Sequence, residues 1–180
     1  MINRFGKHIE ADEVFEAWTS GDLDRMLVAT SLPTNAVDRY HLLQVLIGQI
    51  YRLRAEPTRR ADLFSYGKVF LAELPQLMAQ RQRHDAAVTR ALQVDEEGRA
   101  KRDGRPVREF DTSPKTYHIE VFDQLMRAYC EDERYEDARA VARRAGKVGY
   151  ADDEGVEYLL EGIEKRRRRN EKAQAARTKP

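Results

Sequence analysis

The sequence contains a single cysteine, Cys130, and lacks any long apolar run. One cysteine excludes an internal disulfide bond and indicates a reducing compartment. No stretch of about 18 apolar residues is present to cross a membrane, and the first residues, MINRFGKHIEADEV, lack the apolar segment of a signal peptide. We therefore expect a cytoplasmic protein that makes no membrane contact.

Catalytic motifs are missing as well. The sequence contains no glycine-rich phosphate loop, no Walker lysine and no GxSxG nucleophile elbow. The four histidines, His8, His41, His84 and His118, are scattered, and none lies in an HExxH pair or beside a cysteine ligand. We therefore predict that the protein is not an enzyme and has no catalytic residue, metal ligand, cofactor or small-molecule substrate.

Strand signals are sparse, whereas helix-forming residues are abundant. No convincing run alternates between apolar and polar residues, and charged residues make up 35% of the chain against 41% hydrophobic residues. The 180 residues suffice for one domain with a sizeable core. We expect an all-α fold with wide solvated faces.

The clearest pattern extends from Thr116 to Gly149. In its first half, large apolar side chains recur at steps of three and four residues, which places them on one face of a helix: Val121, Phe122, Leu125, Met126 and Tyr129. A wholly charged turn, residues 131–134, separates this helix from a second one that carries small residues at Ala138, Ala142 and Ala145. The pattern predicts two closely packed antiparallel helices.

This 34-residue unit resembles a tetratricopeptide repeat when it is counted from Ile119. Large apolar residues stand at the family positions of the first helix (Phe122, Leu125, Tyr129), small ones at those of the second (Ala138, Ala145), and Tyr135 at the aromatic position before the second helix. Met126 and Ala142 depart from the family pattern. The run FDQLMRAYCEDERYEDA also resembles a pentatricopeptide repeat. The first resemblance implies stacked helix pairs that bind protein, and the second implies RNA binding.

Further helices are predicted on both sides of this unit. Asp12 is expected to cap a short helix, and Thr34 and Thr58 are expected to cap two longer ones. Pro75 should kink the second of these long helices or end its first part. A last helix from about Asp152 should cover the open end of the final repeat, so that the chain forms a short tetratricopeptide-like superhelix with a C-terminal capping helix.

The main interruption is predicted at residues 93–114. This stretch combines dense charge with two glycines and two prolines, a composition that cannot bury enough apolar surface to order itself. We interpret it as a mobile loop inside a single helical-repeat domain, residues 1–164, because one helix pair alone cannot bury its faces. A flexible linker between two independent domains is the alternative.

The resemblance to tetratricopeptide repeats also implies where a partner would bind, because members of that family hold partners along their first helices. In the register above, Glu120, Asp123 and Arg127 should face this groove, with Cys130 nearby. Their charges suit a basic or mixed-charge protein partner. An ordinary solvated helix face is the competing interpretation.

A basic C-terminal tail, residues 165–180, carries a formal charge of +7, so the remaining 164 residues carry −6. Its core is the run Lys165, Arg166, Arg167, Arg168 and Arg169. Such a run can bind nucleic-acid phosphates, or it can be a solvated helix end favoured by the helix dipole. No aromatic residue for base stacking is interleaved with it.

These observations lead to two functional hypotheses. The first is a non-catalytic adaptor, or a subunit of a larger assembly, that binds a protein through a helical-repeat surface. The alternative is an RNA- or DNA-contacting protein that uses the basic segment and a pentatricopeptide-like surface.

Overall fold

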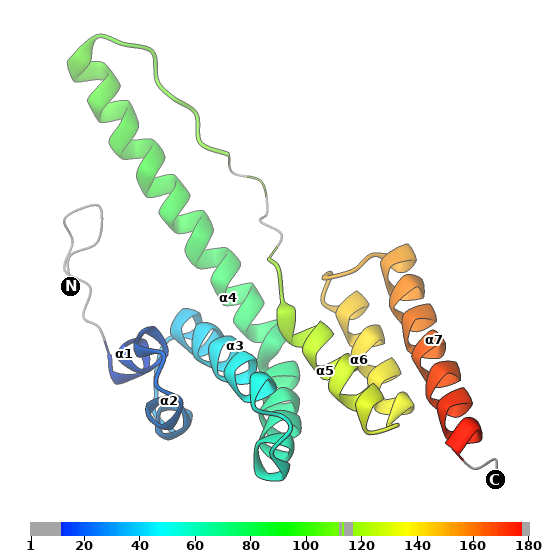
Figure 1. Ribbon diagram of the computed structural model, residues 1–180. Helices are drawn as coiled ribbons and strands as arrows, with labels where there is room; N and C mark the ends of the chain where they lie inside the picture. Colours follow the sequence, from blue (N-terminus) through cyan, green and yellow to red (C-terminus); the bar gives the residue numbers. More distant parts are fainter. Residues whose placement is uncertain (1–11, 112, 114–116, 178–180) are drawn as a thin grey trace.

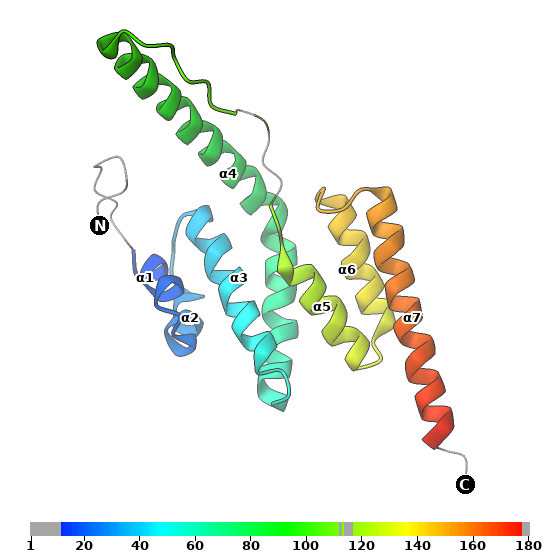
Figure 2. The same ribbon diagram turned by 45° about the horizontal axis from the view of Figure 1, so that its top comes forward.

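Seven helices form the part of the chain that the computed structural model describes, residues 12–111, 113 and 117–177 (Figures 1 and 2). They are α1 (Glu13–Ser20), α2 (Leu23–Ala29), α3 (Ala36–Arg52), α4 (Pro57–Asp103), α5 (Glu120–Glu131), α6 (Tyr135–Lys147) and α7 (Asp153–Arg177). No strand occurs among these described residues, so the predicted all-α class is confirmed. None of the helices found there is both long and apolar enough to cross a bilayer.

The helix starts follow from local capping chemistry. Asp12 caps α1, as predicted, by accepting a hydrogen bond from a backbone N–H of its first turn. The predicted cap of the first longer helix was wrong by one residue, and that of the second by two. Asn35 caps α3, while the Thr34 hydroxyl donates to Asp12 at 2.6 Å. α4 begins with Pro57 in its first turn, where the missing proline N–H costs no helical hydrogen bond, so Thr58 lies inside the helix.

α4 runs without a break for 47 residues and passes through Pro75. Of the two outcomes predicted for Pro75, a kink or an end of the helix's first part, the end is wrong. A proline cannot donate the N–H that the carbonyl four residues earlier would normally accept. That carbonyl belongs to Leu71, and it accepts a hydrogen bond from Arg144 of α6 at 3.1 Å instead. A side chain from another helix thus satisfies the group that the proline leaves without its helical partner.

The predicted loop 93–114 is also wrong for residues 93–103, which form the end of α4 before Gly104 adopts a left-handed conformation with φ 63°. The charged residues there are strong helix formers, and some support the helix directly, as in the 2.8 Å ion pair between Arg99 and Asp95. Beyond Gly104 the chain returns along α4. Phe110 N–H donates to Gln93 at 3.2 Å on this return path. Residues 112 and 114–116 of the predicted loop lie outside the described part.

The helices pack in chain order (Figures 1 and 2). α1 contacts α2 and α3, α3 pairs with α4, and α5 pairs with α6. α5 also contacts α3 and α4 on one side and α7 on the other, while α7 packs mainly on α6. The predicted capping helix therefore covers the second pair, and it continues without interruption through the predicted boundary at residue 165. Residues 178–180 of the predicted tail and 1–11 of the predicted domain lie outside the described part.

α5 lies at the centre of this arrangement. Seven of its twelve residues are buried: Val121, Phe122, Leu125, Met126, Ala128, Tyr129 and Cys130. At its middle, the Leu125 side chain approaches the α4 backbone so closely that a Cβ atom added to Gly67 would lie 2.5 Å from a Leu125 methyl group. The absence of a side chain at Gly67 is therefore what admits Leu125 between the two helices.

The Gly67–Leu125 contact leads to a testable stability pattern. Leu125→Ala should leave a cavity that costs about 2–5 kcal/mol of unfolding free energy. Gly67→Ala should cost about 1–3 kcal/mol through overpacking, less a gain in helix propensity of about 1 kcal/mol. The double variant should lose less than the sum of the two, because the added methyl group fills part of the cavity. Urea unfolding measures all four free energies, and strict additivity would contradict the contact.

The Pro75 arrangement is tested by a second pair of substitutions. In the wild type, Arg144→Leu should cost about 1–3 kcal/mol, because the Leu71 carbonyl loses a charged donor. In a Pro75→Ala background the backbone N–H of residue 75 can donate to that carbonyl, so Arg144→Leu should cost measurably less. Thermal unfolding of the four proteins gives both costs. Equal costs in the two backgrounds would show that Arg144 does not replace the N–H that Pro75 lacks.

Candidate partner-binding site

A depression of about 230 Å³ lies between α5 and α7, and we call it the α5–α7 pocket. Its lining residues are Asp123, Met126, Arg127 and Cys130 from α5 and Tyr158, Leu159, Gly162 and Arg166 from α7. Three of the four residues predicted to lie on a binding face are therefore brought together here. The fourth, Glu120, is exposed in the first turn of α5 and does not line the pocket.

The pocket carries opposite charges beside apolar surface. Asp123 and Arg127 are one helical turn apart on α5 and share a side of that helix, and Arg166 reaches the same pocket from α7. None of these three charged side chains makes an ion pair with another described residue. Met126 and Leu159 add apolar lining. This combination is suited to a peptide segment that offers both charge and an apolar side chain.

Cys130 is only 3% exposed, so it forms part of the pocket's base. Burial raises the pKa of its thiol, an effect that the nearby Arg166 partly opposes. A raised pKa keeps the thiol protonated near neutral pH, whereas a nucleophilic cysteine needs a lowered pKa. Cys130 therefore supplies shape and packing to the pocket.

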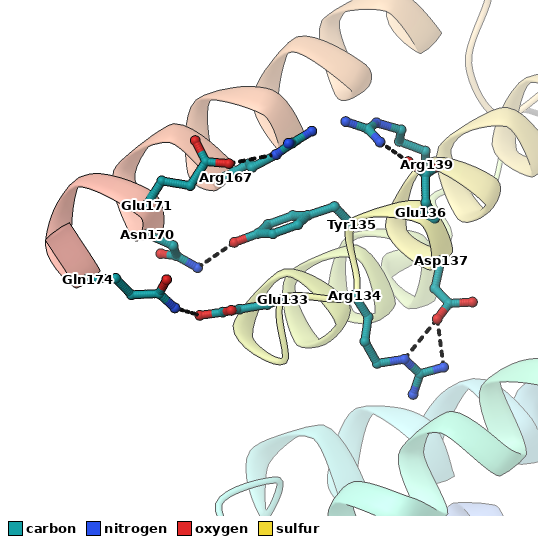
Figure 3. Close-up of a pocket in the computed structure, with 10 residues that line it drawn as sticks. All are labelled: Glu133, Arg134, Tyr135, Glu136, Asp137, Arg139, Arg167, Asn170, Glu171 and Gln174. Atoms are coloured by element: carbon teal, nitrogen blue, oxygen red, sulfur yellow. Dashed lines mark hydrogen bonds and ion pairs between the residues drawn. The ribbon is translucent and has the colours of Figure 1, made fainter.

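A second, polar pocket joins the α5–α6 turn to the C-terminal half of α7 (Figure 3). The Asn170 amide donates to the Tyr135 hydroxyl at 2.9 Å and to the Cys130 carbonyl at 3.3 Å. The Gln174 amide donates to Glu133 (Figure 3). These hydrogen bonds hold the second half of α7 against the turn, so residues that the sequence assigned to a free tail are part of the packed structure.

The basic run is divided among three surroundings. Arg166 lines the α5–α7 pocket, and Arg167 pairs with Glu171 at 2.9 Å beside the second pocket (Figure 3). Lys165, Arg168 and Arg169 point to the solvent side of α7. The five cations of the predicted run therefore lie in three different surroundings, because successive residues of a helix point in different directions.

The carboxylates of the charged turn have partners that the sequence analysis missed. Arg60 of α4 donates to Glu131 and to Asp132, both at 2.7 Å, and to the Ala128 carbonyl at 2.8 Å. Arg54, just after α3, pairs with Glu131 at 3.1 Å. We call these four charged residues the corner network. The signal available in the sequence was a group of arginines around the start of α4, Arg54, Arg59 and Arg60, which could meet the acidic turn after α5.

Two further observations concern His41 and the metal-ligating residue types in the described part of the chain. His41 stacks on Trp18 with ring centres 4.9 Å apart, and burial, followed by the charge of Arg81, lowers its pKa. Within the described ranges, no three His, Cys, Asp or Glu side chains are grouped so that they could hold a metal ion.

Comparisons of the chain with protein-family models, curated proteins and solved structures found no match.

The corner network should make stability depend on pH. Hydrogen bonds from Arg54, and then from Arg60, lower the pKa of Glu131 below its ordinary value of 4.5. The ionised Glu131 therefore stabilises the folded chain above about pH 4.5, and this contribution is lost as the pH falls through the lower folded pKa. We expect Arg60→Met to cost roughly 1 kcal/mol near pH 7, after allowance for solvent screening, and less near pH 3.

Urea unfolding at both pH values measures this difference. The matched control is Arg99→Met, which removes a well-exposed ion pair on α4 and should cost little at either pH. If Arg60→Met costs the same unfolding free energy near pH 7 and near pH 3, its cost does not come from the pairing of Arg60 with an ionised Glu131.

Proposed function

We propose that this protein is a non-catalytic adaptor, or a subunit of a larger assembly, that binds a protein partner at the α5–α7 pocket. The observation that carries the proposal is the unpaired state of Asp123, Arg127 and Arg166 within the described chain. The corner network nearby gives the contrast, because its four charged residues pair with one another. Charges left without partners around an apolar pocket are available to a binding segment.

The packing order supports a tetratricopeptide-like stack as the framework for this binding. α1, α3, α5 and α7, the first helices of successive units, each contact the next one in the series. α2, α4 and α6 each pair with the helix that precedes them. In this arrangement the α5–α7 pocket lies between two adjacent first helices, the location that the family resemblance implies for a partner. The composition of the pocket favours a mixed-charge segment that carries a carboxylate for the two arginines.

The alternative, contact with RNA or DNA, is supported by the exposed cations Lys165, Arg168, Arg169 and Lys172, which form no ion pair within the described chain. Two observations favour the protein partner instead. Two of the five cations in the run are turned toward α5 and the second pocket. The exposed cations share their side of α7 with the carboxylates Glu154, Glu157 and Glu161, which would repel phosphates.

Quantitative affinity capture from a lysate of the source organism tests the proposal. The wild type should retain a defined set of proteins, and Arg127→Glu combined with Arg166→Glu should reduce their capture by about tenfold or more, since reversing buried contact charges costs several kcal/mol. Arg83→Glu on the exposed side of α4 is the matched charge-reversal control and should retain the set.

Nuclease treatment of a parallel sample separates the two functions. Capture that persists after treatment supports the adaptor function. Capture that disappears after treatment, together with direct binding of labelled RNA or duplex DNA by the purified chain, would replace it with the alternative. Equal capture by the wild type and the double variant would exclude the α5–α7 pocket as the binding site.

A further inference from the structure

One side of α7 has no helix packed on it among the described elements. The helix packs on α6 and α5 through its other side, which includes the buried Ile163 and the hydrogen-bonded Asn170. The free side presents residues at alternating steps of four and three, all of them exposed, and we call it the outer face of α7. Its residues are Glu154, Tyr158, Glu161, Lys165, Arg168 and Lys172, flanked by Glu157 and Arg169.

Steps of four and three keep these side chains in one seam along one side of α7. The seam extends from Glu154 to Lys172, a length of about 27 Å at 1.5 Å per residue. Tyr158 is its one large aromatic and is 76% exposed. A face of this length and regularity suits a helical partner better than a compact ligand.

The charges on the outer face are arranged in two blocks. The carboxylates all precede Ile163, and the cations all follow it. Moreover, the two blocks mirror one another about residue 163. Glu161 and Lys165 lie two residues to either side of it, Glu157 and Arg169 six, and Glu154 and Lys172 nine. Tyr158 and Arg168 lie five residues to either side.

This mirror order suits a two-fold symmetric antiparallel helix pair, because each level before the centre then lies opposite the equivalent level after the centre of the other copy. We propose that two copies of this chain associate through the outer faces of α7, with the helices antiparallel and the two-fold axis at the level of residue 163. Each symmetry-related set would bring Glu161 to Lys165 and Glu154 to Lys172 along the centre of the seam, and Glu157 to Arg168 along one edge. Tyr158, on the other edge, would receive Arg169 over its ring, a favourable cation–π contact.

Charge complementarity selects this occupant over a nucleic acid. A second copy neutralises both blocks of the outer face, whereas a phosphate backbone would neutralise only the cations and would meet three carboxylates on the same seam. The cation block from Lys165 to Lys172 covers only about 10 Å of the helix. Within the described chain none of its four cations forms an ion pair, so they are available for contacts between copies.

The association goes beyond the proposed adaptor function, and its strength follows from its chemistry. Exposed ion pairs contribute little individually, and the seam buries only one aromatic side chain per copy. The dimer is therefore expected to be weak and to weaken further as salt screens the charges. The α5–α7 pocket lies on an adjoining side of α7, with Tyr158 at the border between the two surfaces.

Sedimentation equilibrium of the purified full chain tests the proposal through two complementary charge reversals. The acid-reversed variant carries Glu157→Lys and Glu161→Lys, and the base-reversed variant carries Lys165→Glu and Arg168→Glu. Each alone places like charges opposite one another, so self-association should weaken by about tenfold or more relative to the wild type. An equimolar mixture of the two restores opposite charges at all four contacts, and it should associate at least as tightly as the wild type.

Arg83→Glu on α4 is the matched control and should leave the monomer–dimer equilibrium unchanged, and circular dichroism should show the same helix content for every variant. Three results would overturn the proposal. The wild type could stay monomeric at low salt across the accessible concentrations, whether or not it binds duplex DNA through the same cations. The reversed variants could associate as tightly as the wild type. The mixture could associate no better than its components.

Discussion

The close approach of α5 to α4 is the contact on which the rest of the structure depends. Leu125 occupies the space that Gly67 leaves open, and Phe64 of α4 stacks on Tyr129 of α5 with ring centres 4.5 Å apart. The Arg134 guanidinium covers both rings, at 4.9 Å from the centre of Phe64 and 4.7 Å from that of Tyr129. These contacts fix the position of α5, and α5 in turn positions α6 and α7. The pocket between α5 and α7 depends on this placement of α5.

Polar contacts reinforce the same boundary between the two helix pairs. The corner network joins the turn after α3 to the turn after α5, and Arg144 of α6 satisfies the carbonyl that Pro75 leaves without a helical donor. Each contact connects groups about 70 residues apart in the chain. The two pairs are therefore held together by close packing at the centre and by charged hydrogen bonds at the edges.

The helices were predicted correctly where large and small residues repeat clearly at helical spacing. The helices around the charged turn were predicted because large and small residues repeat at helical spacing on both sides of it, and α5 and α6 match those ranges closely. The prediction of a loop from residue 93 onward was wrong for residues 93–103, because dense charge does not exclude a helix. Glu, Arg, Gln and Ala are strong helix formers, and the extended segment after Gly104 covers Ala100 of α4, which is 1% exposed. Composition alone cannot show that a returning segment covers a helix.

Only part of the candidate site could be predicted from the sequence. Asp123, Arg127 and Cys130 could be placed together from the sequence, because steps of four and three share one side of a helix. Arg166 could not, because its position opposite them depends on how α7 docks. The five-residue basic run was read as one cluster, although a helix distributes consecutive residues around its axis. The arginine partner shared by Glu131 and Asp132 could not be predicted, because Arg60 lies about 70 residues away in the sequence.

Native-state hydrogen exchange measured by mass spectrometry tests most directly the claim that α5 joins the two helix pairs into one cooperative unit. Amides of α3, the first half of α4 and α5 are expected to exchange only through the same global opening, with one shared free energy and one shared dependence on denaturant. Exchange of α5, α6 and α7 as a separate unit, at a free energy well below that of α3 and α4, would contradict it.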